Sequence, residues 1–223
     1  MNRPDIAITR SPEQVFATNK VIKNTYILLS ATLLFSGAMA MVSIAVSAPS
    51  WTYLASLIGA MVLGMFVLPK TAQSSSGIGV IFLITGLMGF GLGAVIAMYL
   101  AMPNGPQIVS MSMGGTGVIF LGLSGYALSS KRDFSFLGGF VFAGMIVMML
   151  AVLASIFLQI PALHLAISAG FMLLMSAYIL FQTSQMMNGG ENNYIMATYS
   201  LYIAIFNIFI SLLHILGALS GDD

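Results

Sequence analysis

Ser124 and His164 are the residues of this chain whose types could support nucleophilic chemistry. Ser124 lies in the run Gly122-Leu123-Ser124-Gly125, and His164 lies in a separate apolar stretch. A serine hydroxyl becomes a nucleophile only when a base such as histidine is within hydrogen-bonding reach. The two residues fall near opposite ends of their predicted helices, about 20 Å apart at roughly 1.5 Å per residue. The sequence therefore argues against serine-type intramembrane proteolysis.

Metal and phosphate chemistry lack their residues as well. His164 and His214 are isolated histidines with no HExxH pattern, and cysteine is absent. These two histidines cannot build a zinc site by themselves. The glycine run Gly89-Phe90-Gly91-Leu92-Gly93 lies within a hydrophobic stretch, whereas a phosphate-binding loop lies between a strand and a helix. We therefore expect no catalytic residue, no metal site and no cofactor.

Ion conduction would be indicated by carboxylates or basic residues within the hydrophobic stretches, and they contain none. Asn207 lies near the middle of the last stretch, where an unpaired amide is costly. We expect it to form a hydrogen bond between helices, with contact to a substrate or ion as the alternative. His164, shortly after Pro161, is expected to be an interfacial or hydrogen-bonded structural residue. The strongest polar groups near or within the stretches are Gln159, Gln182, Gln185 and Asn207.

The composition of the chain indicates that these residues lie on membrane-spanning helices. Of its 223 residues, 59% are hydrophobic and 6% are charged, and the mean hydropathy is +1.01. In a soluble domain about one-quarter of the residues are charged, so the surface of this chain has too few charges to face water. Its partner is the lipid bilayer. The seven Lys and Arg are spread along the chain and form no patch for nucleic acid. Apolar runs long enough to span lie at 26–48, 51–68, 77–102, 107–129, 136–158, 161–183 and 194–219.

These runs predict an all-α, polytopic membrane protein, a bundle of seven transmembrane helices. The first run is longer than the roughly 7 to 15 apolar residues of a signal peptide, so we interpret it as a retained helix. Placing the N-terminus in the cytoplasm leaves every Lys and Arg on that side, because basic residues in short loops resist translocation. The predicted division is a flexible cytoplasmic tail at 1–23, a membrane domain at 24–219 and an external tail at 220–223. Within the first tail, Met1 to Asn19 is expected to be disordered.

Glycines gather in the third to fifth apolar runs, and Gly89 and Gly93 form a GxxxG pair. Small residues allow the close backbone approach from which helices in lipid gain packing energy. We expect these runs to form a tight helix seam, with a gating hinge or a wet pore as the alternative. The glycines concerned are Gly86, Gly89, Gly91, Gly93, Gly114, Gly115, Gly117, Gly122, Gly125, Gly138 and Gly139.

Several contiguous stretches resemble the Bax inhibitor family of seven-helix proteins, in particular its bacterial YccA branch. They are Lys20 to Tyr26, Gly115 to Ala127 continuing into Lys131 to Gly139, Ile156 to Ser168, and Asn188 to Ile195. The resemblance covers nearly the whole chain. It implies a bacterial inner-membrane protein with a periplasmic C-terminus. It implies that the chain is a substrate and modulator of FtsH, an ATP-dependent membrane protease. The implied partners are this protease and the regulatory membrane proteins associated with it. Met1 to Asn19 would be the segment that the protease grips.

Other members of the family are calcium leaks that use a pair of aspartates in the last two helices, which makes an ion leak the alternative function. The positions that match this pair are Gln182, in Phe181-Gln182-Thr183-Ser184, and Ala204, in the run Leu201 to Asn207. Neither residue can ionise. The proline that kinks the third helix in the family is also missing, because Gly89 to Gly93 is followed by Ala94. Intramembrane proteolysis of the rhomboid type remains a third alternative.

Overall fold

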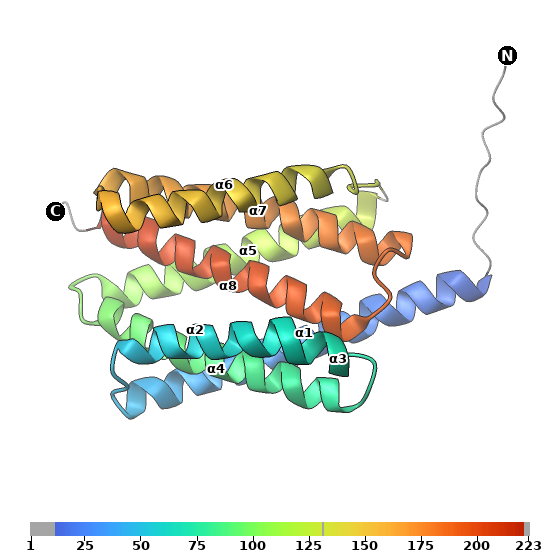
Figure 1. Cartoon of the computed structure of the whole chain (residues 1–223), viewed down its shortest axis with the longest axis horizontal. Coiled ribbons are helices and arrows are strands. Elements are labelled where there is room, and N and C mark those ends of the chain that lie inside the picture. Colours follow the sequence, from blue (N-terminus) through green and yellow to red (C-terminus); the bar gives the residue numbers. More distant parts are fainter. Residues whose placement is uncertain (1–11, 131, 221–223) are drawn as a thin grey trace, which may run out of the picture.

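The computed structural model of the chain describes residues 12–130 and 132–220, and it is built of helices that run side by side (Figure 1). Among these residues, seven helical stretches are long and apolar enough to cross a membrane, as the sequence predicts. The helices are α1 (Pro12–Ala45), α2 (Trp51–Val62), η1 (Leu63–Val67), α3 (Leu68–Thr71), α4 (Ser76–Leu100), α5 (Gly105–Ser130), α6 (Leu137–Leu158), α7 (Pro161–Asn188) and α8 (Tyr194–Leu219).

Helix α8 lies at the centre of the bundle and α6 lies at its edge. Helix α8 packs against α7, α5, α1 and α4, whereas α6 packs mainly against α7. In the most apolar 18-residue window of each helix, 56% of the residues are buried in α8 and 11% in α6. Helix α4 packs against α1 and α2 in the lower part of the view in Figure 1. The core therefore follows α4 and α8, and most of α6 is left to contact lipid.

Helix α1 begins earlier than the sequence analysis predicts. It starts at Pro12, so the second half of the stretch expected to be disordered is helical, and residues 1–11 lie outside the described residues. Its first turns project beyond the bundle (Figure 1), and Phe16 is 73% exposed. The signal was present in the sequence Ser11-Pro12-Glu13, because proline is favoured at the first helical position and acidic residues in the first turn.

The second span continues past residue 68, where the sequence analysis ends its apolar run. Helices α2, η1 and α3 form one span from Trp51 to Thr71. The π-helical turn η1 lies between the two α-helical pieces, and Pro69 falls in the first turn of α3. Proline has no backbone N–H to donate, and the first turn of an α-helix does not need one. The span therefore continues through Pro69 after the π-helical turn.

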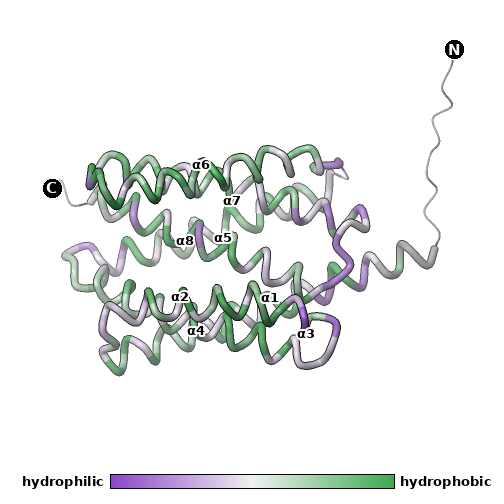
Figure 2. The backbone as a smooth tube through the Cα atoms, viewed as in Figure 1, coloured by the Kyte–Doolittle hydropathy of each residue, from purple (hydrophilic) through white to green (hydrophobic). Residues whose placement is uncertain are grey.

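The described basic residues lie at one end of the bundle, which we call the basic end. Lys20 and Lys23 precede Thr25, whose hydroxyl donates to the carbonyl of Tyr194 at the start of α8. Lys70 and Arg132 lie in or beside connections that meet the same turn between α7 and α8. Hydrophilic segments gather towards the two ends of the molecule, with hydrophobic helix between them (Figure 2). The opposite end carries the connections near residues 46–50, 101–104 and 159–160.

Candidate functional site

Gln182 and Ala204, which the sequence analysis aligns with the acid pair, are buried residues of α7 and α8. Gln182 is 5% exposed and Ala204 is fully buried. At roughly 1.5 Å per residue, Gln182 lies about 9 Å and Ala204 about 15 Å from the basic ends of their helices. The amide nitrogen of Gln182 and the hydroxyl of Thr183 have no hydrogen-bond partner among the described residues. This region can offer hydrogen bonds, but it has no ionisable side chain at either position.

Asp133 forms a polar cluster with the last residues of α7, which lie between Gln182 and the basic end. Its Oδ1 accepts hydrogen bonds from the amide of Ser135 at 2.8 Å, from Ser184 Oγ at 3.3 Å and from Asn188 Nδ2 at 3.2 Å. Ser184 Oγ in turn accepts the amide of Phe134 at 2.9 Å. The hydrogen bonds from Ser135 above all, and also those from Ser184 and Asn188, hold the pKa of the Asp133 carboxyl below its usual value. The cluster fixes the α5–α6 connection on α7.

Asn193 makes a second cross-link at the basic end. Its Oδ1 accepts from the amides of Ile195 at 2.9 Å and Met196 at 3.1 Å, which caps α8. Its Nδ2 donates to the carbonyl of Ala72 at 2.9 Å, and its own amide donates to Glu191 Oε1 at 2.8 Å. The turn between α7 and α8 is therefore attached to the α3–α4 turn. An asparagine directly before an apolar run was a sequence signal for the cap, but not for the contact with Ala72.

Tyr202 joins α8 to α1 and α4 inside the bundle. Its hydroxyl lies 2.6 Å from Ser36 Oγ and donates to the carbonyl of Thr85 at 3.3 Å. All three residues are buried. Sequence reasoning did not single out this group, because a tyrosine and a serine so far apart in the chain give no local signal.

Asn207, for which a hydrogen bond between helices is expected, bonds within its own helix among the described residues. Its Nδ2 donates to the carbonyl of Ile203 at 2.8 Å, one turn earlier in α8 itself. An amide in lipid needs a partner, and the helix backbone supplies one without a neighbouring helix.

Ser124 and His164 lie towards opposite ends of the bundle. The Ser124 hydroxyl is hydrogen-bonded to the hydroxyl of Tyr26 in α1. His164 is in the first turn of α7, at the end remote from the basic residues. The two residues that could have formed a nucleophile and its base are therefore too far apart to act together, and Ser124 is bonded to Tyr26 instead.

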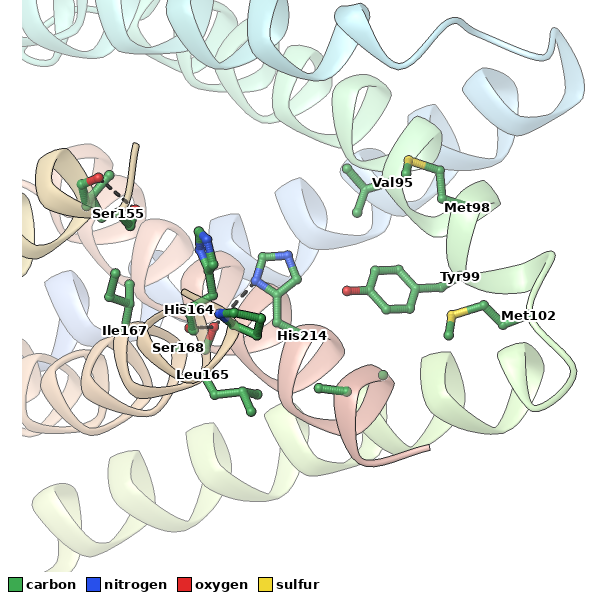
Figure 3. Close-up of a pocket in the computed structure, with 14 residues that line it drawn as sticks. Val95, Met98, Tyr99, Met102, Ser155, His164, Leu165, Ile167, Ser168 and His214 are labelled. Atoms are coloured by element: carbon green, nitrogen blue, oxygen red, sulfur yellow. Dashed lines mark hydrogen bonds between the residues drawn. The ribbon is translucent and has the colours of Figure 1, made fainter. Parts of the chain in front are cut away.

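His164 lines a pocket of about 860 Å³ at the end opposite the basic residues (Figure 3). Tyr99 reaches it from α4, His164 and Ser168 from α7, and His214 from α8. The rings of Tyr99 and His214 have centroids 6.4 Å apart. Ser168 Oγ donates to the carbonyl of His164 at 3.0 Å and lies 3.5 Å from His214 Nδ1. The structure thus brings together the two histidines that the sequence analysis treated as isolated.

The lining of the pocket combines hydrogen-bonding groups with apolar side chains. Among the described residues, no Asp, Glu, Lys or Arg lines it, and no group of three or more His, Cys, Asp or Glu could hold a metal ion. What it offers is two imidazoles, a phenol and hydroxyls beside aliphatic and methionine side chains.

Comparison with known proteins gives matches along nearly the whole chain. The family model described as "Inhibitor of apoptosis-promoting Bax1" matches residues 18–221. A protein of Escherichia coli strain K12, named "Modulator of FtsH protease YccA", is 47% identical over 208 residues, which are 93% of this chain and 94% of that protein. Its counterpart in Escherichia coli O6:H1, named "Inner membrane protein YccA", matches equally well. An uncharacterized membrane protein of Vibrio cholerae is 46% identical over the full length of both chains.

Proposed function

We propose that this chain, which belongs to the Bax inhibitor family, modulates an FtsH-type membrane protease and does not act as an enzyme itself. It is a multi-pass protein of the inner membrane. The observation that carries the proposal is the 47% identity, over 93% of the chain, with the Escherichia coli protein named as a modulator of FtsH. The separation of Ser124 from His164 also favours a binding role. No observation at Gln182 or Ala204 favours an ion leak, because neither side chain can ionise.

The basic end is proposed to face the cytoplasm, with the C-terminus in the periplasm. Its support is the gathering of the described Lys and Arg at that end. Basic residues in short connections are retained on the cytoplasmic side of a membrane. This orientation places the start of α1 on the side where an ATP-dependent protease would act.

The start of the chain is proposed as the segment where degradation begins. The first turns of α1 project beyond the bundle (Figure 1), and residues 1–11 precede them. The other segments at the basic end are held at both sides. Asn193 is bonded to Ala72, and Asp133 is bonded to Ser184. A protease that pulls on a chain needs a segment it can displace without first breaking the bundle.

The test is a pulse-chase of the intact chain and of a variant that lacks residues 2–11, in cells with and without the protease. This deletion spares the whole of α1, so it removes no contact of the described structure. We expect the shortened chain to persist while the intact chain is degraded, and both to persist when the protease is absent. A variant with residues 2–11 in shuffled order is the control for length against sequence.

Modulation is followed in the same cells through the half-life of a second membrane substrate. The shortened chain should accumulate and occupy the protease, and thereby lengthen that half-life. Equal half-lives of the intact and shortened chains would contradict the role of the N-terminal segment. An unchanged half-life of the second substrate would contradict the modulator function.

A further inference from the structure

We propose that the pocket at the end opposite the basic residues binds an uncharged amphiphile from the bilayer. A hydroxyl or carbonyl head would bond to Tyr99, His164 and His214, and an acyl chain would lie along the apolar wall (Figure 3). This site is separate from the proposed start of degradation, because the pocket lies at the other end of the bundle.

Three polar side chains that line the pocket have unused hydrogen-bond donors and acceptors. Among the described residues, the Tyr99 hydroxyl and the His164 ring have no hydrogen-bond partner, and the His214 ring has only the 3.5 Å contact with Ser168. They come from α4, α7 and α8, and Figure 3 shows Tyr99 pointing towards the His214 ring. Together they can both donate and accept hydrogen bonds, which suits a hydroxyl or a carbonyl.

The depth of these groups suits the head of a lipid. Tyr99 lies in the last turn of α4, His164 in the first turn of α7, and His214 five residues before the end of α8. At roughly 1.5 Å per residue, all three are within about 8 Å of a helix end, where the hydrocarbon region gives way to the interface. A head at this depth can bond to the protein while its chain stays in hydrocarbon.

The remaining wall of the pocket suits an acyl chain. It includes Val95 and Met98 of α4, Val152 of α6 and Leu165 of α7. Methionine and aliphatic side chains adapt to a flexible chain and offer it no polar group. The volume of about 860 Å³ lies within the range of roughly 300 to 1,000 Å³ that is usual for ligand pockets.

The absence of formal charge in the lining selects the class of head group. None of the fourteen lining residues is Asp, Glu, Lys or Arg. A phosphate, carboxylate or ammonium head would lose hydration there without gaining an ion partner. A monoacylglycerol, with hydroxyls and an ester carbonyl, meets the same walls without that cost.

The test uses the full-length protein in nanodiscs and a monoacylglycerol with a diazirine in its acyl chain as the photoreactive probe. A chelator is present, so that no metal ion bridges the two histidines. We expect saturable labelling of α4, α6, α7 and α8 residues that line the pocket. Unlabelled monoacylglycerol should displace the probe, and phosphatidylglycerol and fatty acid should not.

Variants connect the labelling to particular groups. Tyr99→Phe, which keeps the ring and loses one hydroxyl, should weaken apparent binding roughly five-fold. Ala218→Phe should fill part of the pocket and abolish saturable labelling. Tyr126→Phe is the matched control, because Tyr126 is a half-exposed tyrosine of α5 towards the basic end.

Three results would overturn the proposal. The first is unsaturable labelling spread over the lipid-facing side of α6. The second is equal displacement of the probe by the charged lipids. The third is unchanged binding by Tyr99→Phe and Ala218→Phe proteins that are folded, as shown by thermal melting.

Discussion

The glycines of α4 and those of α5 are alike in sequence but lie in different surroundings. A Cβ added at Gly89 or Gly93 would overlap a backbone carbonyl of α1, that of Ser36 or of Ala40. At Gly91 it would lie 2.7 Å from the Cβ of Ser56 in α2. In α5, the Cβ position of Gly114, Gly117, Gly122 and Gly125 has no neighbour within 4 Å among the described residues, apart from the helix's own backbone. The predicted glycine seam is therefore present in α4 and absent from this face of α5.

The two helices differ because α4 is enclosed and α5 is covered on one face. Helix α4 lies against both α1 and α2, while α5 contacts mainly α8 and α7. In α5, seven buried residues follow one another at intervals of three or four, which is one side of a helix. The four open glycines fall outside this series, which is Gly105, Ile108, Ser112, Thr116, Phe120, Ser124 and Ala127. A glycine stabilises a membrane bundle only where another backbone comes close to it.

The largest effect is expected from Gly89→Ala. The new methyl group would overlap the carbonyl oxygen of Ser36, which is backbone and cannot rotate away, so α1 and α4 must separate. We expect a loss of about 2 to 3 kcal/mol in the free energy of unfolding. Unfolding by SDS in mixed micelles measures it. The control is Gly59→Ala in α2, whose Cβ would meet Leu87 at an ordinary 3.6 Å. Equal stability of the Gly89 variant and the control would refute the seam.

A smaller and reversible effect is expected from Gly91→Ala. Here the two nearest atoms are the Cβ and Oγ of the Ser56 side chain, at 2.7 and 3.1 Å, and the Cα of Tyr53 follows at 3.2 Å. We expect a loss of about 1 to 2 kcal/mol. Ser56→Gly should recover most of that loss in the double variant, as a double-mutant cycle would measure.

Ser36→Gly provides the contrast to this rescue. It leaves the backbone carbonyl in place and should not rescue Gly89→Ala. Strict additivity at Gly91 and Ser56 would show that the helices accommodate the methyl group in another way.

The sequence predicted the spans well and the surroundings of individual residues poorly. The last span, 194–219, agrees with α8 at both ends, because asparagines precede it and hydropathy is high throughout. For a helix in lipid, hydropathy does not tell which face packs against other helices, since both faces are apolar. For this reason the enclosed glycines of α4 and the open ones of α5 looked the same.

The candidate site shows the same division. Gln182, Ala204 and His164 could be named from the sequence, through family resemblance or residue type. The bond between Ser36 and Tyr202 and the pairing of Tyr99 with His214 join residues of different helices. No local pattern encodes such contacts, because they depend on how the helices pack.

The smallest effect is expected from Gly122→Ala in α5, and it should have the opposite sign. Among the described residues, the added methyl group meets no atom of another helix within 4 Å, so it costs no packing. Glycine in a helix interior is less favourable than alanine by roughly 0.5 to 1 kcal/mol, because it loses more backbone freedom on folding. We therefore expect unchanged stability or a slight gain, measured by the same SDS unfolding.

Gly115→Ala in the same helix is the internal control for this prediction. Its Cβ would lie 3.2 Å from the end of the Leu212 side chain in α8, so Leu212 must move slightly. The cost of this movement offsets the gain in helix propensity from glycine to alanine. The expected order of stability is thus Gly122→Ala first, then Gly115→Ala, then Gly89→Ala. A loss at Gly122 as large as that at Gly89 would show that the open face of α5 is packed in the membrane, and the contrast between the two helices would then fail.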